Sequence, residues 1–239
     1  MGDGIGNDAA IMPFISSANI ACGYHAGDET IMKRTIQLAL QYNVCIGAHP
    51  SFLDRENFGR KEMNLTASEV FDLVLSQIKL LDTIAKTLGA KLHHVKPHGA
   101  LYNISARDSF IAKAIAEAVK DFDPHLILFG LSGSHSIQQA KELGLKTASE
   151  VFADRTYGND GSLTPRSLKG ALIENADKAV VQALQMIQEK TVTTLAGKKI
   201  SIVAETICIH GDGKHAVEFA QQIHEAIRKE GIMIQSIGQ

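Results

Sequence analysis

The 239-residue chain contains no tryptophan, and aromatic residues make up only 5% of it. So few aromatic side chains argue against a platform on which nucleobases or sugar rings stack. The net charge is −2 and there is no run of basic residues, which disfavours a surface for nucleic acids or anionic membranes. No apolar stretch is long enough to span a bilayer, and the first eight residues lack the basic and apolar regions of a signal peptide.

Cysteine is also scarce, with an odd number of residues, Cys22, Cys45 and Cys208, and no CxxC pair. Each lies in an apolar, strand-like run, which favours reduced and mostly buried thiols in a cytoplasmic protein over a catalytic cysteine. The sequence contains neither the phosphate-binding GxxxxGK[ST] motif nor the zinc-binding HExxH motif. Local spacing therefore does not by itself indicate a nucleotide site or a metal site.

The pattern that is present is a regular alternation of strand-like and helical segments. We predict helices over 28–42, 66–88, 106–121, 134–143, 176–190 and 214–229, and strands over 15–22, 43–50, 92–99, 126–131, 146–154 and 205–212. Residues 200–204 could begin or precede a strand, and residues 232–237 could add a last short one. Strict alternation without a linker predicts one α/β domain over residues 1–239, with a parallel sheet and outer helices. A barrel is favoured over an open doubly wound sheet because polar side chains recur at nearly every strand end.

Several predicted strands end in side chains that can do chemistry, and parallel strands bring such ends to one rim. Four end in a histidine and a fifth in carboxylates: His25, His49, His98 and His210, and Glu150 with Asp154. Each histidine alone could be structural, but four together suggest a site. The rim could bind a divalent metal, carry out acid–base catalysis, or bind an anion through Lys96, Arg60 or Arg155.

Lys96 lies within a predicted strand, two residues before His98. If its side chain points into a barrel, it must pair with a carboxylate or lie near an anion, whereas an outward lysine would extend into water. His93 and His94, earlier on this strand, are interpreted as structural or partly exposed. The turn 130–134 could hold a phosphate or carboxylate on its backbone amides, or be a plain loop.

Six segments together resemble the LamB/YcsF family: residues 17–28, 47–51, 58–60, 95–103, 150–155 and 208–212. The resemblance implies a distorted TIM-like (β/α)7 barrel of the glycoside hydrolase/deacetylase type, with parallel strands. It also implies ATP-dependent opening of 5-oxo-L-proline (pyroglutamate) to L-glutamate, with ADP and phosphate as further products, together with separate B and C subunits. Family members begin with an additional acidic strand, so we expect the first barrel strand to precede Met1.

These considerations define a candidate site. The residues expected to be catalytic are His25, His49, Lys96, His98, Glu150, Asp154 and His210, with Glu150 or Asp154 as the base. Those expected to bind substrate are Asn19, Arg60, Tyr102, Arg155 and Asp212. ATP is the expected cofactor, and a divalent metal (Mg or Zn) could bind at His25 and His49. A metal-dependent deacetylase or amidohydrolase, and a lactam- or carbohydrate-binding protein, are the alternatives; the sequence leaves assembly into a homo-oligomer open.

Overall fold

The computed structural model describes residues 1–211, 213 and 215–238. Six strands form one sheet in the order β1-β2-β3-β4-β5-β8, and every pairing in it is parallel. They are β1 (Ser17–Ala21), β2 (Cys45–His49), β3 (Leu92–Val95), β4 (Ile127–Leu131), β5 (Lys146–Phe152) and β8 (Thr206–Cys208). The predicted α/β class with parallel strands is therefore confirmed.

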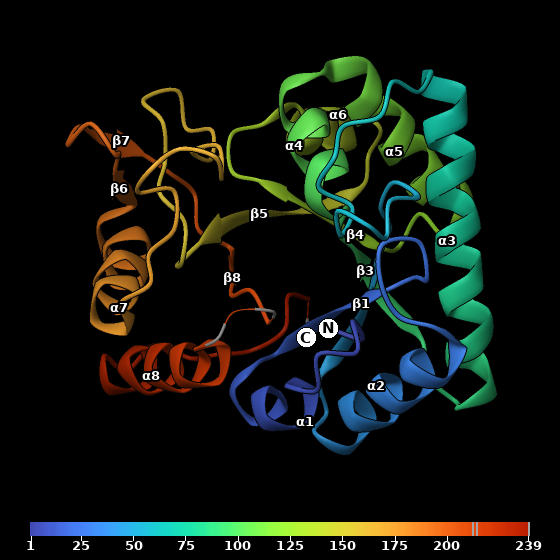
Figure 1. The fold of residues 1–239 in the computed structure, drawn as a ribbon, viewed down its shortest axis with the longest axis horizontal. Helices are drawn as coiled ribbons and strands as arrows, with labels where there is room; N and C mark the ends of the chain where they lie inside the picture. Colours follow the sequence, from blue (N-terminus) through green and yellow to red (C-terminus); the bar gives the residue numbers. More distant parts are fainter. Residues whose placement is uncertain (212, 214, 239) are drawn as a thin grey trace.

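The sheet curls like part of a barrel wall, with helices around its outside (Figure 1). Its strands follow one another in chain order, so it lacks the reversal of order that marks a doubly wound sheet. The described residues contribute six strands to it, one fewer than the resemblance implies, and β1 and β8 are its outer strands. All six strands present their carboxyl ends at the same rim.

The helices connect these strands on the outer face. They are α1 (Asp8–Ile11), α2 (Glu29–Gln41), α3 (Ala67–Thr87), α4 (Gly99–Arg107), α5 (Ser109–Phe122), α6 (His135–Glu142), α7 (Ala176–Leu184) and α8 (Ala216–Lys229), with a 3₁₀ turn at Met12–Phe14 and a π turn at Gln185–Glu189. None of the helices in the described part of the chain is both long and apolar enough to cross a membrane.

The longest helix, α3, begins where the sequence predicts it. The Thr66 hydroxyl accepts a hydrogen bond from the Glu69 N–H, and the Glu69 carboxylate accepts one from the Thr66 N–H, which completes a capping box. Its buried side includes Val70, Val74 and Ile78, as the periodicity predicts. Because this side is apolar and the opposite side is polar, α3 lies lengthwise against the sheet and α5.

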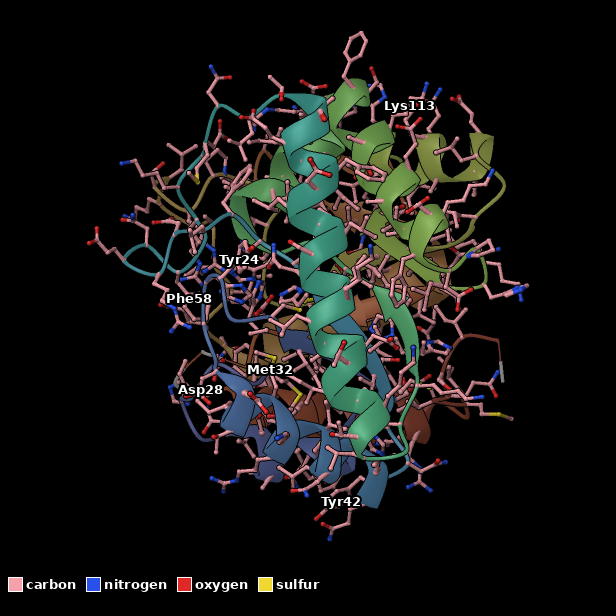
Figure 2. The ribbon with its side chains drawn as sticks, turned by 90° about the vertical axis from the view of Figure 1, so that its right-hand side faces the viewer. Tyr24, Asp28, Met32, Tyr42, Phe58 and Lys113 are labelled. Atoms are coloured by element: carbon pink, nitrogen blue, oxygen red, sulfur yellow. The ribbon has the colours of Figure 1, made fainter. Side chains whose placement is uncertain are left out.

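Figure 2 looks onto α3 and shows how the segments around it lie. Asp28 caps α2 by accepting a hydrogen bond from the Ile31 N–H, as predicted, and Met32 in its first turns is buried. Tyr42, just after α2, is exposed. Phe58 lies in the long polar loop after β2, close to the rim where the candidate site is built.

The structure differs from the predicted elements in three places. The segment after Pro97 forms a separate helix, α4, and Asp108 then begins α5 by capping the N–H groups of Phe110 and Ile111. A small antiparallel hairpin, β6 (Thr191–Thr193) with β7 (Lys199–Ser201), forms outside the main sheet, directly after the predicted helix 176–190 and at the start of the segment 200–204. Residues 232–237 form no strand.

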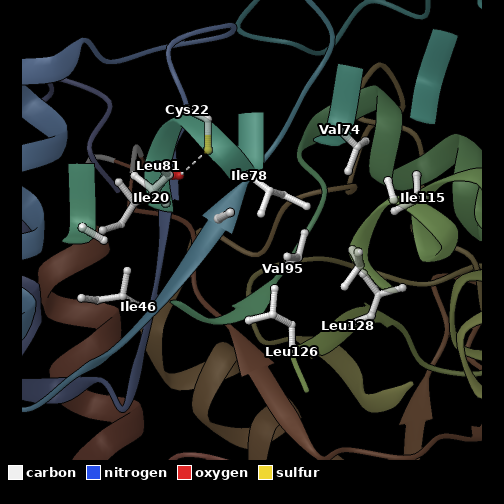
Figure 3. Packing of buried hydrophobic residues seen from close by; sticks show 14 of the residues in the cluster. Ile20, Cys22, Ile46, Val74, Ile78, Leu81, Val95, Ile115, Leu126 and Leu128 are labelled. Carbon is white, nitrogen blue, oxygen red and sulfur yellow. Dashed lines mark hydrogen bonds between the residues drawn. The ribbon is translucent and has the colours of Figure 1, made fainter. Parts of the chain in front are cut away.

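The main hydrophobic core lies between the first four strands and the helices that cover them. Figure 3 shows part of it, with Ile20 and Ile46 from the strands facing Ile78 and Leu81 from α3. The Cys22 thiol lies in this core and donates a hydrogen bond to the Ile20 carbonyl oxygen. None of the three cysteines forms a disulfide, and Cys22 and Cys208 are buried and Cys45 is partly buried, as predicted.

Candidate functional site

A cavity of about 970 Å³ opens at the carboxyl ends of the strands. It is lined by residues from both halves of the curled sheet, including six of the predicted catalytic residues: His25, His49, Lys96, His98, Glu150 and His210. The seventh, Asp154, lies behind the lining and contacts His210. The predicted rim therefore exists, but its residues separate into three groups with different partners.

The first group is a cluster of three histidines from the ends of β1, β2 and β3. The chain beyond β3 stays beside the chain beyond β2, because the Lys96 N–H donates to the Ala48 carbonyl and the His98 N–H to the Pro50 carbonyl. This places His49 Nε2 at 2.9 Å from His98 Nδ1. His25 stacks on His98, with ring centroids 4.0 Å apart and an interplanar angle of 9°.

One ring nitrogen from each of these histidines lies within 4.8 Å of one from each of the others, so the three together could bind a metal ion. Burial, followed by positive charges that include Arg55 and Arg60, lowers the pKa of His25 to about 3. Burial likewise holds the pKa values of His49 and His98 well below the usual value. The cluster is therefore uncharged at neutral pH and offers lone pairs.

The second group surrounds the ammonium of Lys96. Its Nζ lies 2.7 Å from a carboxylate oxygen of Glu150 and donates to the Cys208 thiol at 3.0 Å. The Tyr102 and Phe152 rings flank it, with centroids at 5.6 and 5.2 Å. Burial acts to lower the pKa of Lys96, but Cys208 and Glu150 outweigh burial and hold it above the usual value. The lysine thus points inward and is paired, as one of the two sequence alternatives predicts.

Two buried polar atoms in this second group make no hydrogen bond of good geometry, although the Tyr102 phenol lies close enough to the Glu150 carboxylate for this carboxylate to help raise its pKa. They are Glu150 Oε2 and the Tyr102 hydroxyl oxygen, both on residues that line the cavity. Burial raises the pKa of Tyr102 well above its usual value, so the phenol keeps its proton. A buried acceptor and a buried donor left unpaired in a native structure call for an explanation, and a bound polar molecule supplies one.

The third group is the pair Asp154 and His210, which follow β5 and β8 on neighbouring strands. His210 Nδ1 lies 2.8 and 3.0 Å from the two carboxylate oxygens of Asp154, and the His210 backbone N–H also donates to this carboxylate. Burial alone would raise the pKa of Asp154, but His210 lowers it below the usual value. The carboxylate therefore fixes the ring and leaves His210 Nε2 to accept a proton.

Four of the five residues predicted to bind substrate lie at the cavity. Asn19, Arg60, Tyr102 and Arg155 line the cavity, and Asp212 falls outside the described residues. The Asn19 side-chain oxygen lies 2.9 Å from His94 Nε2. Arg155 donates to the carbonyl oxygens of Thr164 and Ala171, so this buried guanidinium also holds the loop beside it. Burial, followed by Arg166, lowers the pKa of Arg155 to about 10.

Three residues at the site are not among those predicted. Ser51 lies 2.8 Å from His25 Nδ1, the Phe58 carbonyl accepts from His98 Nε2, and Cys208 contacts Lys96. Ser51, Phe58 and Cys208 each lie in a segment that carries the family resemblance, which is the only sequence signal that could have indicated them. Cys208 is 112 residues from Lys96, so local spacing gives no indication of this contact.

A sequence model of the LamB/YcsF family matches residues 1–239. The chain belongs to this family. Proteins named as the A subunit of 5-oxoprolinase from Oceanobacillus iheyensis and Shouchella clausii are 52% and 54% identical to it, over 97% of this chain and 90% and 92% of theirs. Among solved structures, the lactam utilization protein from Thermus thermophilus superposes with a TM-score of 0.91 at 42% identity, over 97% of this chain and 93% of that one. The family predicted from the sequence is therefore confirmed.

Proposed function

We propose that this chain is the A subunit of a 5-oxoprolinase, which hydrolyses 5-oxo-L-proline to L-glutamate and ATP to ADP and phosphate, together with B and C subunits. The observation that carries the proposal is the buried Lys96–Glu150 pair in the cavity, with Glu150 Oε2 and the Tyr102 hydroxyl unpartnered beside it. The relatives, which are named as the A subunit of 5-oxoprolinase, support the same activity.

A five-membered lactam has the polar groups that these side chains need. Its ring N–H can donate to Glu150 Oε2, and its carbonyl oxygen can accept from the Tyr102 hydroxyl. The Lys96 ammonium then lies close to the negative charge that develops on this oxygen when the carbonyl is attacked. Such a site discriminates against molecules without the lactam N–H, because the buried carboxylate oxygen would stay unpaired.

An amide resists water because resonance stabilises it, and ATP supplies the activation by phosphorylating the lactam oxygen. The chain's own part is to deliver water and move its proton. With Nδ1 held by Asp154, His210 accepts the proton of the attacking water at Nε2 and returns a proton to the ring nitrogen as the C–N bond breaks, which leaves an acyl phosphate of glutamate. A second water then attacks this acyl phosphate and releases phosphate and L-glutamate. In this proposal Asp154 positions His210, and His210 is the base. The sequence carries no GxxxxGK[ST] motif, so we place part of the ATP site on the B and C subunits.

A second candidate is favoured by the histidine cluster. Three uncharged histidines around one point are also the ligands of metal-dependent amide hydrolases, which need no ATP. In that case the isolated chain would hydrolyse an amide by itself, and a chelator would stop it.

Glutamate release from 5-oxo-L-proline by the chain, alone and with its B and C subunits, distinguishes the candidates when measured with and without ATP and EDTA. We expect release only with ATP and all three subunits, and a loss of about 100-fold or more in Lys96→Met, because the charge facing the oxygen is gone. Lys113→Met is the matched control: Lys113 lies on α5 at the outer surface and should keep the full rate (Figure 2).

Three results would count against the proposal. Turnover by the isolated chain without ATP, stopped by EDTA, would establish the second candidate. Lactam binding without turnover in any mixture would indicate a binding protein. A full rate in Lys96→Met would show that the site lies elsewhere.

A further inference from the structure

The three clustered histidines each donate one ring proton to a fixed acceptor. His49 Nδ1 lies 2.7 Å from the Lys96 carbonyl oxygen, and His98 Nε2 lies 2.8 Å from the Phe58 carbonyl oxygen. A carbonyl oxygen can only accept, so both of these nitrogens carry hydrogen. In an uncharged imidazole the other nitrogen then has a lone pair. This leaves His49 Nε2 and His98 Nδ1 without a proton.

The protonated nitrogen of His25 can be assigned in the same way. Its Nδ1 lies 2.8 Å from the Ser51 hydroxyl oxygen, and that hydroxyl donates its own hydrogen to the Phe52 carbonyl at 2.9 Å. The Ser51 oxygen therefore accepts from His25 Nδ1–H, and His25 Nε2 is the unprotonated nitrogen. All three rings are held in the tautomer that leaves one lone pair each.

Two of these lone pairs face each other. His49 Nε2 and His98 Nδ1 are 2.9 Å apart, a hydrogen-bond distance, yet neither has a proton to share. A cation between the two nitrogens is needed to stabilise this contact. A proton would make a buried imidazolium, and none of the carboxylates in the described residues pairs with His25, His49 or His98 to compensate it. A buried charge without such a partner is costly.

We propose that His49 and His98, with His25, bind one divalent transition metal of the Zn²⁺ type. Uncharged imidazole nitrogens suit Zn²⁺, whereas Mg²⁺ requires oxygen ligands. A backbone carbonyl that accepts from the second ring nitrogen is the usual support of a ligating histidine, and His49 and His98 both have it. The cavity provides access for the ion and room for water ligands.

Binding requires two small movements. Neighbouring nitrogens of a tetrahedral zinc site lie about 3.3 Å apart, so His49 and His98 must separate by a few tenths of an ångström. A metal lies near the plane of each imidazole it binds, so His25 must turn out of its stack on His98. His49 and His98 are therefore the primary ligands, and His25 contributes less affinity.

The loop over the cluster fits this arrangement. Gly59 has φ +67°, and a Cβ there would lie 2.9 Å from the His25 Cβ and 3.0 Å from His98 Cδ2. A glycine at this position lets the backbone pass directly over the two rings and present the Phe58 carbonyl to His98.

The inference rests on the histidines alone and does not depend on the lactam reaction. The test uses the full chain without ATP, lactam or other subunits. After chelation, Zn²⁺ binding is measured by calorimetry and Co²⁺ binding by its visible absorption, which reports nitrogen ligands and tetrahedral geometry. We expect one ion per chain, a loss of affinity of at least about 100-fold in His49→Ala and His98→Ala, and a loss of about 10-fold in His25→Ala. His125→Ala, at an exposed histidine, is the control and should bind like the unchanged chain.

The proposal is overturned if the unchanged chain binds no ion, or if His98→Ala binds it equally well while its melting temperature shows that it is folded. It is also overturned if ¹⁵N spectra of the metal-free chain show one proton shared by His49 and His98 and added Zn²⁺ does not displace it. Zinc binding with no glutamate release would leave this inference standing and contradict only the proposed function, and the converse result would contradict only this inference.

Discussion

The two sides of the rim hold the same residue type in opposite electrostatic settings. On the β1–β3 side, His25, His49 and His98 meet carbonyl oxygens, a hydroxyl and one another. On the β5–β8 side, His210 meets the carboxylate of Asp154 through both of its oxygens. The first setting disfavours a charged ring through burial, whereas the second places a carboxylate against the ring nitrogen.

This difference assigns different chemistry to histidines that look alike in the sequence. An uncharged cluster is suited to ligate a metal, while a histidine oriented by a carboxylate is suited to move protons. Lys96 joins the two sides, because its carbonyl oxygen accepts from His49 and its ammonium reaches Glu150 on β5 and Cys208 on β8.

Removing the Lys96 ammonium, which connects the two sides, should have the largest effect on stability. In Lys96→Met, Glu150 remains buried without its partner, and we expect a loss of about 3–5 kcal/mol in the free energy of unfolding. Urea denaturation measures the loss. The double variant Lys96→Met/Glu150→Gln leaves no uncompensated charge and should recover most of it. A single variant as stable as the unchanged chain would show that the pair is not buried as described.

Asp154→Asn should have the next largest effect, on the carboxylate side alone. An asparagine keeps the shape but cannot stabilise the protonated ring of His210, so we expect glutamate release by the complete enzyme to fall about 100-fold. Asp72→Asn, at an exposed position on α3, should change nothing. If metal binding at the histidine cluster fell together with the rate, the two sides would not be the separate units described above.

The same variant makes a prediction about pH. The pKa of Asp154 is lower in the folded chain than its ordinary value, so its contribution to stability is present above that ordinary value and is lost as pH falls through the lowered one. The melting temperature of Asp154→Asn should lie below that of the unchanged chain at neutral pH, and the gap should close below about pH 4. A gap that stays constant in acid would contradict the stabilisation of the Asp154 carboxylate by its contacts with His210.

Much of this architecture follows from local patterns. The alternation of helices and strands and the capping box at Thr66 could be predicted, because both depend on neighbours in sequence. A simple burial rule left the inward Lys96 as one of two alternatives, and the structure has this one. Helix α4 could not be predicted, since it begins at Gly99, directly after a proline and the strand-end histidine His98. The β6–β7 hairpin was missed because three-residue strands carry too little periodicity.

The division of the rim could not be predicted either. It depends on which strands are neighbours: β1, β2 and β3 place three histidines together, and β5 beside β8 places Asp154 against His210. The sequence presents five polar strand ends without indicating which of them will meet. Phe58 is a further case, because its positive φ of 56°, which turns its carbonyl toward His98, is rare for an aromatic residue.

The smallest expected effect tests how the histidine side is held. Gly47 lies within β2, and a Cβ there would lie only 2.1 Å from His94 Nε2, so the His94 ring crosses the strand where a side chain would be. Gly47→Ala must displace this ring and its contact with Asn19, and we expect a loss of about 1–3 kcal/mol in the free energy of unfolding.

Gly211→Ala is the control. Its Cβ would meet its nearest neighbour at an ordinary 3.7 Å, so this substitution should lower the free energy of unfolding by less than about 0.5 kcal/mol. Equal losses in the two variants would contradict the close packing. A larger loss in Gly47→Ala that does not change in acid would show that packing holds the histidine side, whereas charge holds the carboxylate side.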